Sequence, residues 1–563
     1  MLQAGFTESF HLDTRGGGNA GSVVAARLSE NQDFKILVVE AGPSNEEIPV
    51  SQIPGLSHDI GVYGTRVDWN YTMTPQTHVN GRADTYPRAM MLGGCTSHNE
   101  MMYTRGSRDD YDRWASVTGD DNLAWDNIFH YILKVGPPLS LSEVNHYDPA
   151  VHGVNGTLET SAPYYLHPFN DVLFEAIKEQ SDEFPYLVDM NGGRPIGMGW
   201  DHDTISGGYR SSSATAYLAP SGDNVHILLN TRVTRILPTT NSNGTDIRKI
   251  EFTTSPDGPR STLTAKKELI LSGGVTNTPQ ILLNSGIGPS DELEALNIST
   301  LINNPSVGKN FSDQPAVPLG FTTNLPTDDF NVTEALAQWH DSHTGRLATS
   351  PHLSPLGWVR FPDSANPFQD GSPDPTGGPD TPHVEIFFRN ITALPSSTDG
   401  NASIIAYVVN INPVSRGSIT LASSSPFDAP LIDPNFLAEP IDTAIILEGI
   451  RSALRLFSAQ AFSGVVFGTN SPAPNANGTL TDEVIVDFIQ HNATPFIHGV
   501  ASCSMGPHGA DWGVVDPEFK VRGVTGLRIV DASVIPVVPS GHTQASVYAI
   551  SEWGSEVIKR AWN

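Results

Sequence analysis

Cysteine is nearly absent from this chain of 563 residues, which contains only Cys95 and Cys503. Two cysteines cannot supply the several cross-links of a disulfide scaffold, and each lies inside one of the motifs described below. We therefore expect two buried thiols and no disulfide framework. A chain of this length can bury a large core without cross-links and should form about two or three domains.

Basic residues and long apolar runs are also scarce. The chain has 32 Lys and Arg against 61 Asp and Glu, for a net charge of −29. Such a surface repels phosphate backbones, which argues against nucleic-acid binding. No apolar run reaches the roughly 18 residues that span a membrane, so no membrane insertion is expected. Residues 1–10 lack the apolar segment of a signal peptide.

Asparagine followed at the second position by Ser or Thr, with a residue other than proline between them, occurs ten times, although such triplets also arise by chance in chains rich in Ser and Thr. Together with the few lysines they predict a glycosylated, exported protein. We expect secretion, with the signal peptide absent from this numbering. The triplets begin at Asn70, Asn155, Asn243, Asn297, Asn310, Asn331, Asn390, Asn401, Asn477 and Asn492.

A glycine motif near the N-terminus has the spacing of a dinucleotide site. Gly16, Gly18 and Gly21 precede apolar residues at helical spacing, and a strand over 35–40 ends at Glu40. In such a unit the glycines let the backbone approach a pyrophosphate, and the acid takes the ribose hydroxyls. We prefer this reading to a plain glycine turn.

The segment before these glycines matches the expected apolar strand poorly. Residues 10–15 are polar and charged, where a central parallel strand is normally continuously apolar. Either this strand is unusual or the first 15 residues come from an aberrant start.

A second glycine step, Gly93-Gly94, is followed by small residues and then by His98 and Asn99. Glycine pairs allow a backbone to wrap a phosphate or a ring, and these two side chains would add polar groups. The alternative is an ordinary loop with a capping histidine.

Two histidines near the C-terminus, His498 and His542, each lie in a loop rich in Gly and Ser. Between them, residues 526–531 form an apolar strand that ends at Asp531. Histidine suits proton transfer near neutral pH. We interpret the pair as facing a substrate alcohol; the alternative is two structural loop histidines. Upstream, Pro326 to Ser403 is predicted to be irregular, with surface loops rich in Gly, Pro and Asp.

Together these motifs resemble the glucose–methanol–choline (GMC) family of FAD-dependent oxidoreductases over nearly the full length. Residues 210–218 and 512–517 look most like the fungal aryl-alcohol oxidase and pyranose dehydrogenase branch. The resemblance rests on five segments: 16–21 with Glu40, 92–99, 278–288, 498–506 and 526–542.

The resemblance implies an α/β fold in two parts. A Rossmann-like FAD-binding domain would use residues 1–155, 210–318 and 501–563. An α+β substrate domain with an antiparallel sheet would use residues 156–209 and 319–500.

The same resemblance implies FAD as cofactor and no metal. His98 would be bound covalently to the flavin, as in choline oxidase and pyranose dehydrogenase; the alternative is noncovalent packing. Val233 would lie near the adenine, and Asp531 near the ribityl chain or pyrophosphate. The full set of implied cofactor-binding residues is Gly16, Gly18, Gly21, Glu40, Gly93, Gly94, His98, Asn99, Val233, Asp531 and Thr543.

The implied reaction oxidises the CH–OH group of an aryl alcohol, sugar or other alcohol. His498 would be the general base and His542 the hydrogen-bond partner of the oxygen, while hydride passes to flavin N5. Oxygen or a quinone would be the acceptor, and a monomer is expected. Ile497 and Glu100 stand where aryl-alcohol oxidases place aromatic gates, which weakens an aryl donor. Two alternatives to alcohol oxidation remain: a lyase or cyclase with structural FAD, and an inactive member of the family with a damaged first strand.

Overall fold

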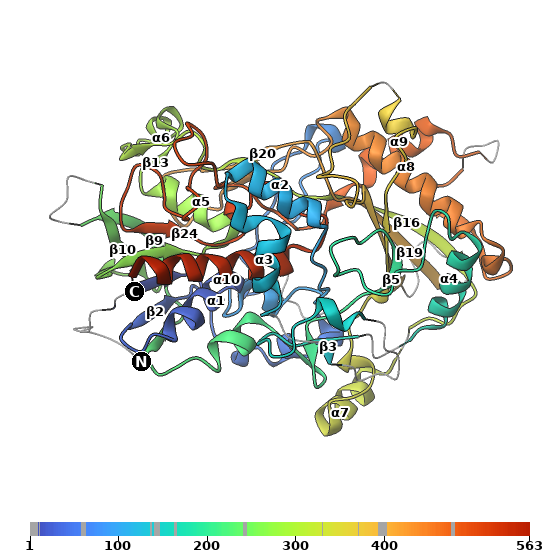
Figure 1. The fold of residues 1–563 in the computed structure, drawn as a ribbon, viewed down its shortest axis with the longest axis horizontal. Helices are drawn as coiled ribbons and strands as arrows, with labels where there is room; N and C mark the ends of the chain where they lie inside the picture. The colour runs from blue at the N-terminus through green and yellow to red at the C-terminus, as the bar shows by residue number, and fades with distance from the viewer. Residues whose placement is uncertain are drawn as a thin grey trace.

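The computed structural model describes residues 10, 12–57, 64–134, 138–139, 147–162, 166–239, 245–328, 330–369, 371–391, 402–474 and 479–562. Three of the glycosylation triplets, at Asn243, Asn401 and Asn477, lie outside these residues. Two lobes lie side by side along the long axis of the molecule (Figure 1). One lobe is built on a parallel sheet and the other on an antiparallel sheet, as the resemblance predicts.

The parallel sheet has five strands taken from both ends and the middle of the chain. Strands β2, β12 and β24 are buried along their whole length, which suits a sheet covered on both faces. The order across the sheet is β24 (Leu527–Ile529), β12 (Glu268–Leu271), β1 (Leu12–Arg15), β2 (Ile36–Val39) and β8 (Val225–Leu228).

Strand β1 forms at the centre of this sheet despite its polar sequence. Its backbone pairs in parallel with β12 on one side and with β2 on the other. Phe10, just before the strand, is fully buried and packs with Leu37 and Val39 of β2. The polar segment therefore does form the strand that should precede the glycine motif.

Helices α1 (Asn19–Ser29) and α10 (Thr543–Trp562) lie beside each other against this lobe (Figure 1). Arg27 of α1 forms an ion pair with the buried carboxylate of Glu552 in α10, at 2.8 Å. Helix α3 (Trp125–Ile132) packs on α10. The first and last helices of the chain thus support the same glycine loop.

The second lobe is a seven-stranded sheet with antiparallel neighbours. Helix α8 (Pro440–Phe457) covers one face, and the other face turns toward the first lobe. The strands are β22 (Val466–Ser471), β16 (Pro315–Thr323), β19 (Ala402–Asn410), β18 (Val384–Ile391), β17 (Leu353–Val359) and β5 (Gly197–Trp200), with β23 (Thr494–Pro495) beside β16.

The prediction that 326–403 is irregular is wrong for strands β17 and β18 and for helix α7 (Val332–Ser342). All seven residues of β17 are buried, so no alternation of polar and apolar residues marks it in the sequence. Strand β16 also crosses the domain boundary expected at residue 318. Cys503 is buried as expected, but Cys95 is only half-buried; both are free thiols.

The remaining elements surround these two sheets. Two three-stranded sheets are β9 (Arg232–Pro238) with β10 (Ile247–Thr253) and β11 (Ser261–Thr264), and β15 (Lys309–Phe311) with β20 (Gly417–Thr420) and β21 (Leu431–Asp433). Two-stranded pairs are β3 (Pro138–Leu139) with β4 (Thr160–Ser161), β6 (Ile205–Ser206) with β7 (Tyr209–Arg210), and β13 (Ile287–Gly288) with β14 (Ile302–Asn303). The other helices are α2 (Arg108–Thr118), α4 (Pro168–Glu179), α5 (Gly274–Asn284), α6 (Ser290–Ala295), α7 (Val332–Ser342) and α9 (Asp482–Asn492).

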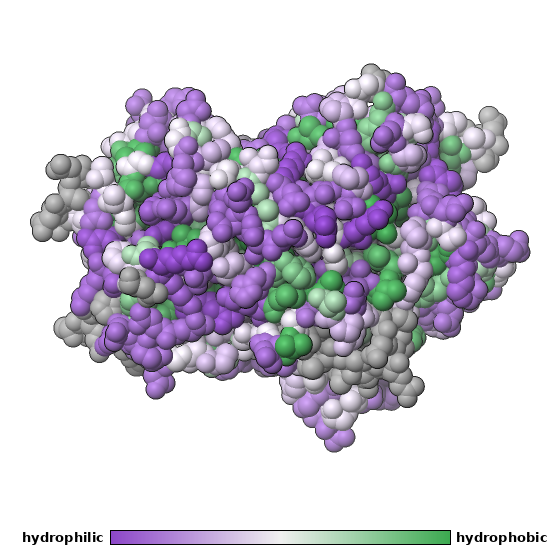
Figure 2. All heavy atoms as spheres, viewed as in Figure 1, coloured by the Kyte–Doolittle hydropathy of each residue, from purple (hydrophilic) through white to green (hydrophobic). Residues whose placement is uncertain are grey.

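Hydrophilic residues dominate the face shown in Figure 2, with apolar side chains in scattered patches. This distribution agrees with the net charge of −29. Among the described residues, every helix is too short or too polar to cross a lipid bilayer.

The buried ion pair between Arg528 of β24 and Glu268 of β12 gives the first prediction. Two hydrogen bonds of 2.7 and 3.0 Å join the groups. Arg528→Ala should lower the free energy of unfolding by about 3–5 kcal/mol, because it leaves a buried carboxylate without its partner. Urea denaturation measures the loss. Lys178→Ala, which breaks an exposed pair with Glu175, should cost less than about 1 kcal/mol; equal losses would contradict the argument.

Candidate active site

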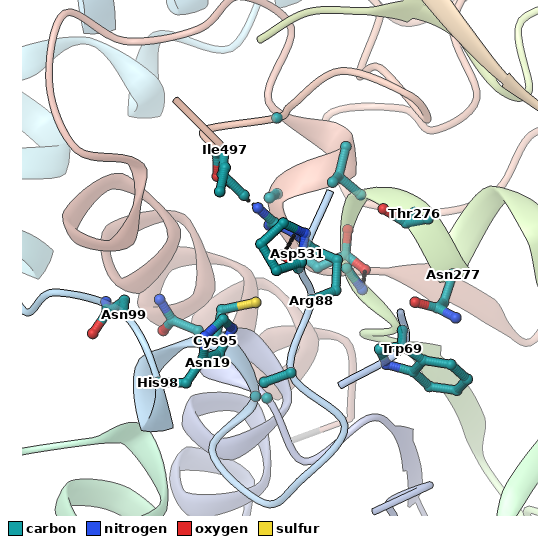
Figure 3. A pocket seen from close by; sticks show the side chains of 18 of the residues that line it. Asn19, Trp69, Arg88, Cys95, His98, Asn99, Thr276, Asn277, Ile497 and Asp531 are labelled. Atoms are coloured by element: carbon teal, nitrogen blue, oxygen red, sulfur yellow. Dashed lines mark hydrogen bonds between the residues drawn. The ribbon is translucent and has the colours of Figure 1, made fainter. Parts of the chain in front are cut away.

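One cavity of about 1020 Å³ runs from the glycine loop of the first lobe to the two C-terminal histidines. All of the expected site residues line it except Gly21 and Gly93. In Figure 3 the side chains of His98 and Asn99 lie on one side of the view, and those of Trp69 and Asn277 lie on the other. The structure therefore brings together motifs that are far apart in the sequence.

The glycine loop requires glycine for steric reasons. Gly16 has a φ of 109°, a conformation that residues with a side chain rarely adopt. A Cβ on Gly21 would lie 1.8 Å from the carbonyl oxygen of Gly16. Gly21 therefore lies outside the cavity but lets helix α1 pack closely on the loop. Gly18 caps the N-terminus of that helix and faces the cavity.

Glu40 follows β2 and holds the same loop. Its carboxylate accepts hydrogen bonds from the backbone N–H groups of Gly17 at 2.8 Å and Gly42 at 2.9 Å. Burial raises the pKa of Glu40 to about 7, and these two hydrogen bonds oppose the shift. The carboxylate thus lies beside the glycine turn, at the end of a parallel strand where ligands of such sheets bind.

The second glycine step packs directly on the first loop. The N–H of Gly93 donates to the carbonyl of Gly17 at 2.7 Å. A Cβ on Gly94 would approach the Cα of Gly18 to 2.8 Å. Gly93 therefore supports the wall from behind, whereas Gly94 forms part of it.

His98 and Asn99 come next and both line the cavity. Burial, with contributions from Arg88 and Arg210, lowers the pKa of His98 to about 3, so its imidazole is neutral at neutral pH. Arg210 donates to the Asn99 side-chain oxygen at 2.7 Å, and the Asn99 amide donates to Gln544 at 3.1 Å.

The other expected cofactor residues come from three elements. Val233 lies on β9, and Thr543 begins α10. Asp531 accepts hydrogen bonds from the N–H of Gly274 at 2.9 Å and from the hydroxyl of Thr278 at 2.6 Å. Its carboxylate therefore fixes the start of α5 at the cavity wall.

His498 is held in one tautomer by Gln314. The Gln314 amide nitrogen donates to the carbonyls of Ile411 and Pro539, at 3.1 and 3.0 Å, which leaves its oxygen as the acceptor. That oxygen lies 2.7 Å from Nδ1 of His498, so Nδ1 carries the proton. Nε2 is then the basic nitrogen. Burial, with His542 and Arg88 nearby, lowers the pKa of His498 well below its ordinary value.

The backbone at His498 is also fixed. Its N–H donates to Asp313 at 2.7 Å, and burial raises the pKa of that carboxyl to about 6. Ile497, just before it, has a φ of 66°, which is unusual for a β-branched residue, and Arg88 holds its carbonyl oxygen at 2.7 Å. Such strain is maintained only where the surroundings determine the conformation.

His542 lies beside His498, with the ring centroids 4.7 Å apart. Its Nε2 is 2.9 Å from a carboxylate oxygen of Glu385, a fully buried residue of β18. Nε2 therefore carries a proton that it donates to Glu385, and Nδ1 is the remaining nitrogen. The two histidines thus have different partners, an amide for one and a carboxylate for the other.

Sequence reasoning missed Asp313, Gln314 and Glu385. A signal for Glu385 was present, because Val384-Glu385-Ile386-Phe387-Phe388 places one charge inside an apolar run. A charged residue in such a run is rarely buried without a partner. Asp313 and Gln314 carry no comparable signal, since nothing in the sequence relates them to His498.

Two buried groups of three outside the cavity have the spacing of metal ligands, among the residues that the structure describes. Each contains an N···O distance of 2.6 Å, between His152 and Asp189 in one and between His352 and Asp201 in the other. Each group thus contains one short hydrogen bond between an imidazole and a carboxylate.

Two family models, both described as GMC oxidoreductase, match residues 14–316 and 413–551. A pyranose dehydrogenase of Agaricus campestris is 49% identical over 97% of this chain and 93% of its own length. A glucose dehydrogenase [FAD, quinone] of Drosophila melanogaster is 32% identical over 97% of this chain and 86% of its own length.

Among solved structures, a formate oxidase of Aspergillus oryzae RIB40, in a variant studied for its effect on FAD modification, superposes with a TM-score of 0.89. It is 27% identical, and the match covers 99% of both chains. The family expected from the motifs is thus confirmed. The chain belongs to the GMC oxidoreductase family and is an FAD-dependent oxidoreductase that acts on CH–OH donors.

Proposed function

We propose that this protein is a sugar dehydrogenase that oxidises a ring CH–OH group and passes the electrons to a quinone or similar organic acceptor. The observation that carries the proposal is the pair His498 and His542, held in different hydrogen-bonding states at the end of the cavity. The similarity to a pyranose dehydrogenase supports a sugar donor, and the similarity to a glucose dehydrogenase [FAD, quinone] supports the acceptor.

The cavity fits FAD in shape and in chemistry. The loop of Gly16 and Gly18 would receive the pyrophosphate, because it presents backbone N–H groups at the start of α1. The Glu40 carboxylate would accept the ribose hydroxyls. Gly94, His98 and Asn99 would line the flavin part. When bound, FAD supplies a two-electron acceptor for the hydride of the donor.

His498 would take the proton of the donor hydroxyl. Its Nδ1 proton is committed to Gln314, and its low pKa keeps Nε2 unprotonated at neutral pH. A neutral base with a free lone pair is the form that proton abstraction requires.

His542 would orient the donor oxygen from the other side. Its Nε2 proton is committed to Glu385, so Nδ1 is the nitrogen that can meet the substrate. A hydrogen bond at Nδ1 would hold the donor hydroxyl in place beside His498.

Export and glycosylation remain part of the proposal. The triplet asparagines Asn70, Asn155, Asn297 and Asn331 are exposed and accessible to a glycan. Asn492 is half-buried, and its amide donates to the carbonyl of Phe488 at 2.9 Å, which disfavours modification there.

The experiment that tests the function is anaerobic reduction of the purified protein. Flavin absorbance should bleach with glucose and return when a quinone is added. Benzyl alcohol at the same concentration should bleach it more slowly. A flavin spectrum that no alcohol or sugar bleaches would contradict the proposal and favour a lyase or cyclase with structural FAD.

Glu385→Gln should lower kcat/KM for the sugar about 10- to 100-fold. The change removes a charge-assisted hydrogen bond, of about 1.5–3 kcal/mol, from His542 while keeping the side-chain size. Stopped-flow flavin reduction measures it. Glu251→Gln, which alters a carboxylate bonded to Arg235 outside the cavity, is the control and should leave the rate unchanged. A normal rate of flavin reduction in the Glu385→Gln variant would show that the carboxylate has no role in the mechanism.

His98 should carry a covalent bond to FAD. It is buried in the wall of the cavity that would hold the flavin, and a neutral ring nitrogen is the form able to bond to carbon. After denaturation in acid or urea and gel filtration, the yellow colour should stay with the polypeptide. The His98→Ala protein should release its flavin in the same treatment. Complete release from the unchanged protein would show that the attachment is noncovalent.

A further inference from the structure

A charged pair lies on the wall of the cavity and has no part in the chemistry described above. Arg389 of β18 forms an ion pair with Glu100, which follows the second glycine step in the sequence. Both residues line the cavity, and their side chains are 15% and 21% exposed.

Strand β18 fixes the distance between this pair and the histidines. Residues 385, 387 and 389 alternate along the strand and share the face that turns to the cavity. Glu385 reaches His542 at 2.9 Å. Four residues at about 3.3 Å each place Arg389 roughly 13 Å further along the strand.

Aromatic side chains fill the interval. Phe387 stacks on Tyr407 with centroids 4.6 Å apart and packs on Phe496 at 5.4 Å; all three line the cavity. The Arg389 guanidinium lies 6.0 Å from the ring centroids of Phe387 and Tyr407. The wall therefore presents, in order, the catalytic histidines, an apolar aromatic surface and a charged pair.

A single sugar ring is too short to span this wall. A six-membered ring built from bonds near 1.5 Å measures roughly 5–6 Å across with its hydroxyl groups. A ring whose CH–OH group meets His498 and His542 would cover the aromatic surface, and only a further group beyond it would reach Arg389. A guanidinium and a carboxylate offer several donors and acceptors for hydroxyls, whereas an apolar group there would leave both partly desolvated.

We propose that Glu100 and Arg389 form a distal recognition site for the second, hydroxyl-bearing unit of the donor, so that the pair selects disaccharides over monosaccharides and aryl alcohols. The site rests on the proposed sugar oxidation, since it takes the position of the donor from the two histidines. It determines specificity without touching the reacting atoms.

The test compares maltose and cellobiose with glucose in steady-state assays with a quinone acceptor. Arg389→Met keeps the length and the contact with the aromatic rings but removes the donors, and Glu100→Gln removes the charge. Each variant should lose about 10- to 100-fold in kcat/KM for the better disaccharide, the range expected for a lost charged hydrogen bond. The value for glucose should change less than about three-fold.

Arg235→Met is the matched control, because it breaks an arginine–glutamate pair outside the cavity; it should leave both values unchanged. A purely structural role for the pair would lower the values for glucose and the disaccharides together. That result, or an unchanged ratio in both variants, would overturn the distal site while the sugar dehydrogenase activity stands. If neither glucose nor a disaccharide reduces the flavin, the proposed function itself fails and the distal site with it. The flavin content of each variant verifies that it is folded. Arg389→Met and Glu100→Gln test the distal site independently, because each removes one member of the pair.

Discussion

The hydrogen bond from His542 to Glu385 joins the two lobes at the point where the chemistry is expected. His542 directly precedes helix α10 of the first lobe, and Glu385 lies on β18 of the second. The bond is buried, so it is strong only while the lobes remain together, and a carboxylate left without its partner there would be costly. This hydrogen bond therefore links the position of the His542 ring to the contact between the lobes.

The position of His498 also depends on bonds that cross the boundary between the lobes. Its own loop runs beside β16, and the Gln314 oxygen that fixes its tautomer belongs to a side chain whose amide bonds to Ile411 and Pro539, on either side of the lobe boundary. The partners differ in charge: an amide oxygen accepts the Nδ1 proton of His498, whereas a carboxylate accepts the Nε2 proton of His542. Two identical side chains thus differ in the ring nitrogen that is left free, because their hydrogen-bond partners, Gln314 and Glu385, differ.

The sequence predicted the parts of this site that are governed by local sterics. Glycine is required where a backbone approaches another backbone, so Gly16, Gly21 and Gly94 could be recognised from spacing alone. Gln314 could not, and Glu385 could be noticed only as a charge inside an apolar run, because each meets its histidine through a side-chain hydrogen bond across more than 150 residues. Strands buried on both faces also lack alternation, which hid β17. Strand β1 is the opposite case. Its polar composition argues against a central strand, yet its backbone pairs with a neighbouring strand on both edges.

The cavity wall explains why the family alone does not determine the substrate. The glycine loops and the histidines concern the cofactor and the reacting carbon, which all donors share. Further along the wall, Glu100 and Arg389 bring charge to a surface that Phe387, Tyr407 and Phe496 line with aromatic rings. A polar group in that position costs free energy unless a ligand or a partner satisfies it, and here the two residues satisfy each other in the free protein. In the proposed distal site, a donor would have to offer hydroxyls of its own to compete for that pair, which would tie the choice of substrate to an interaction about 13 Å along the strand from His542.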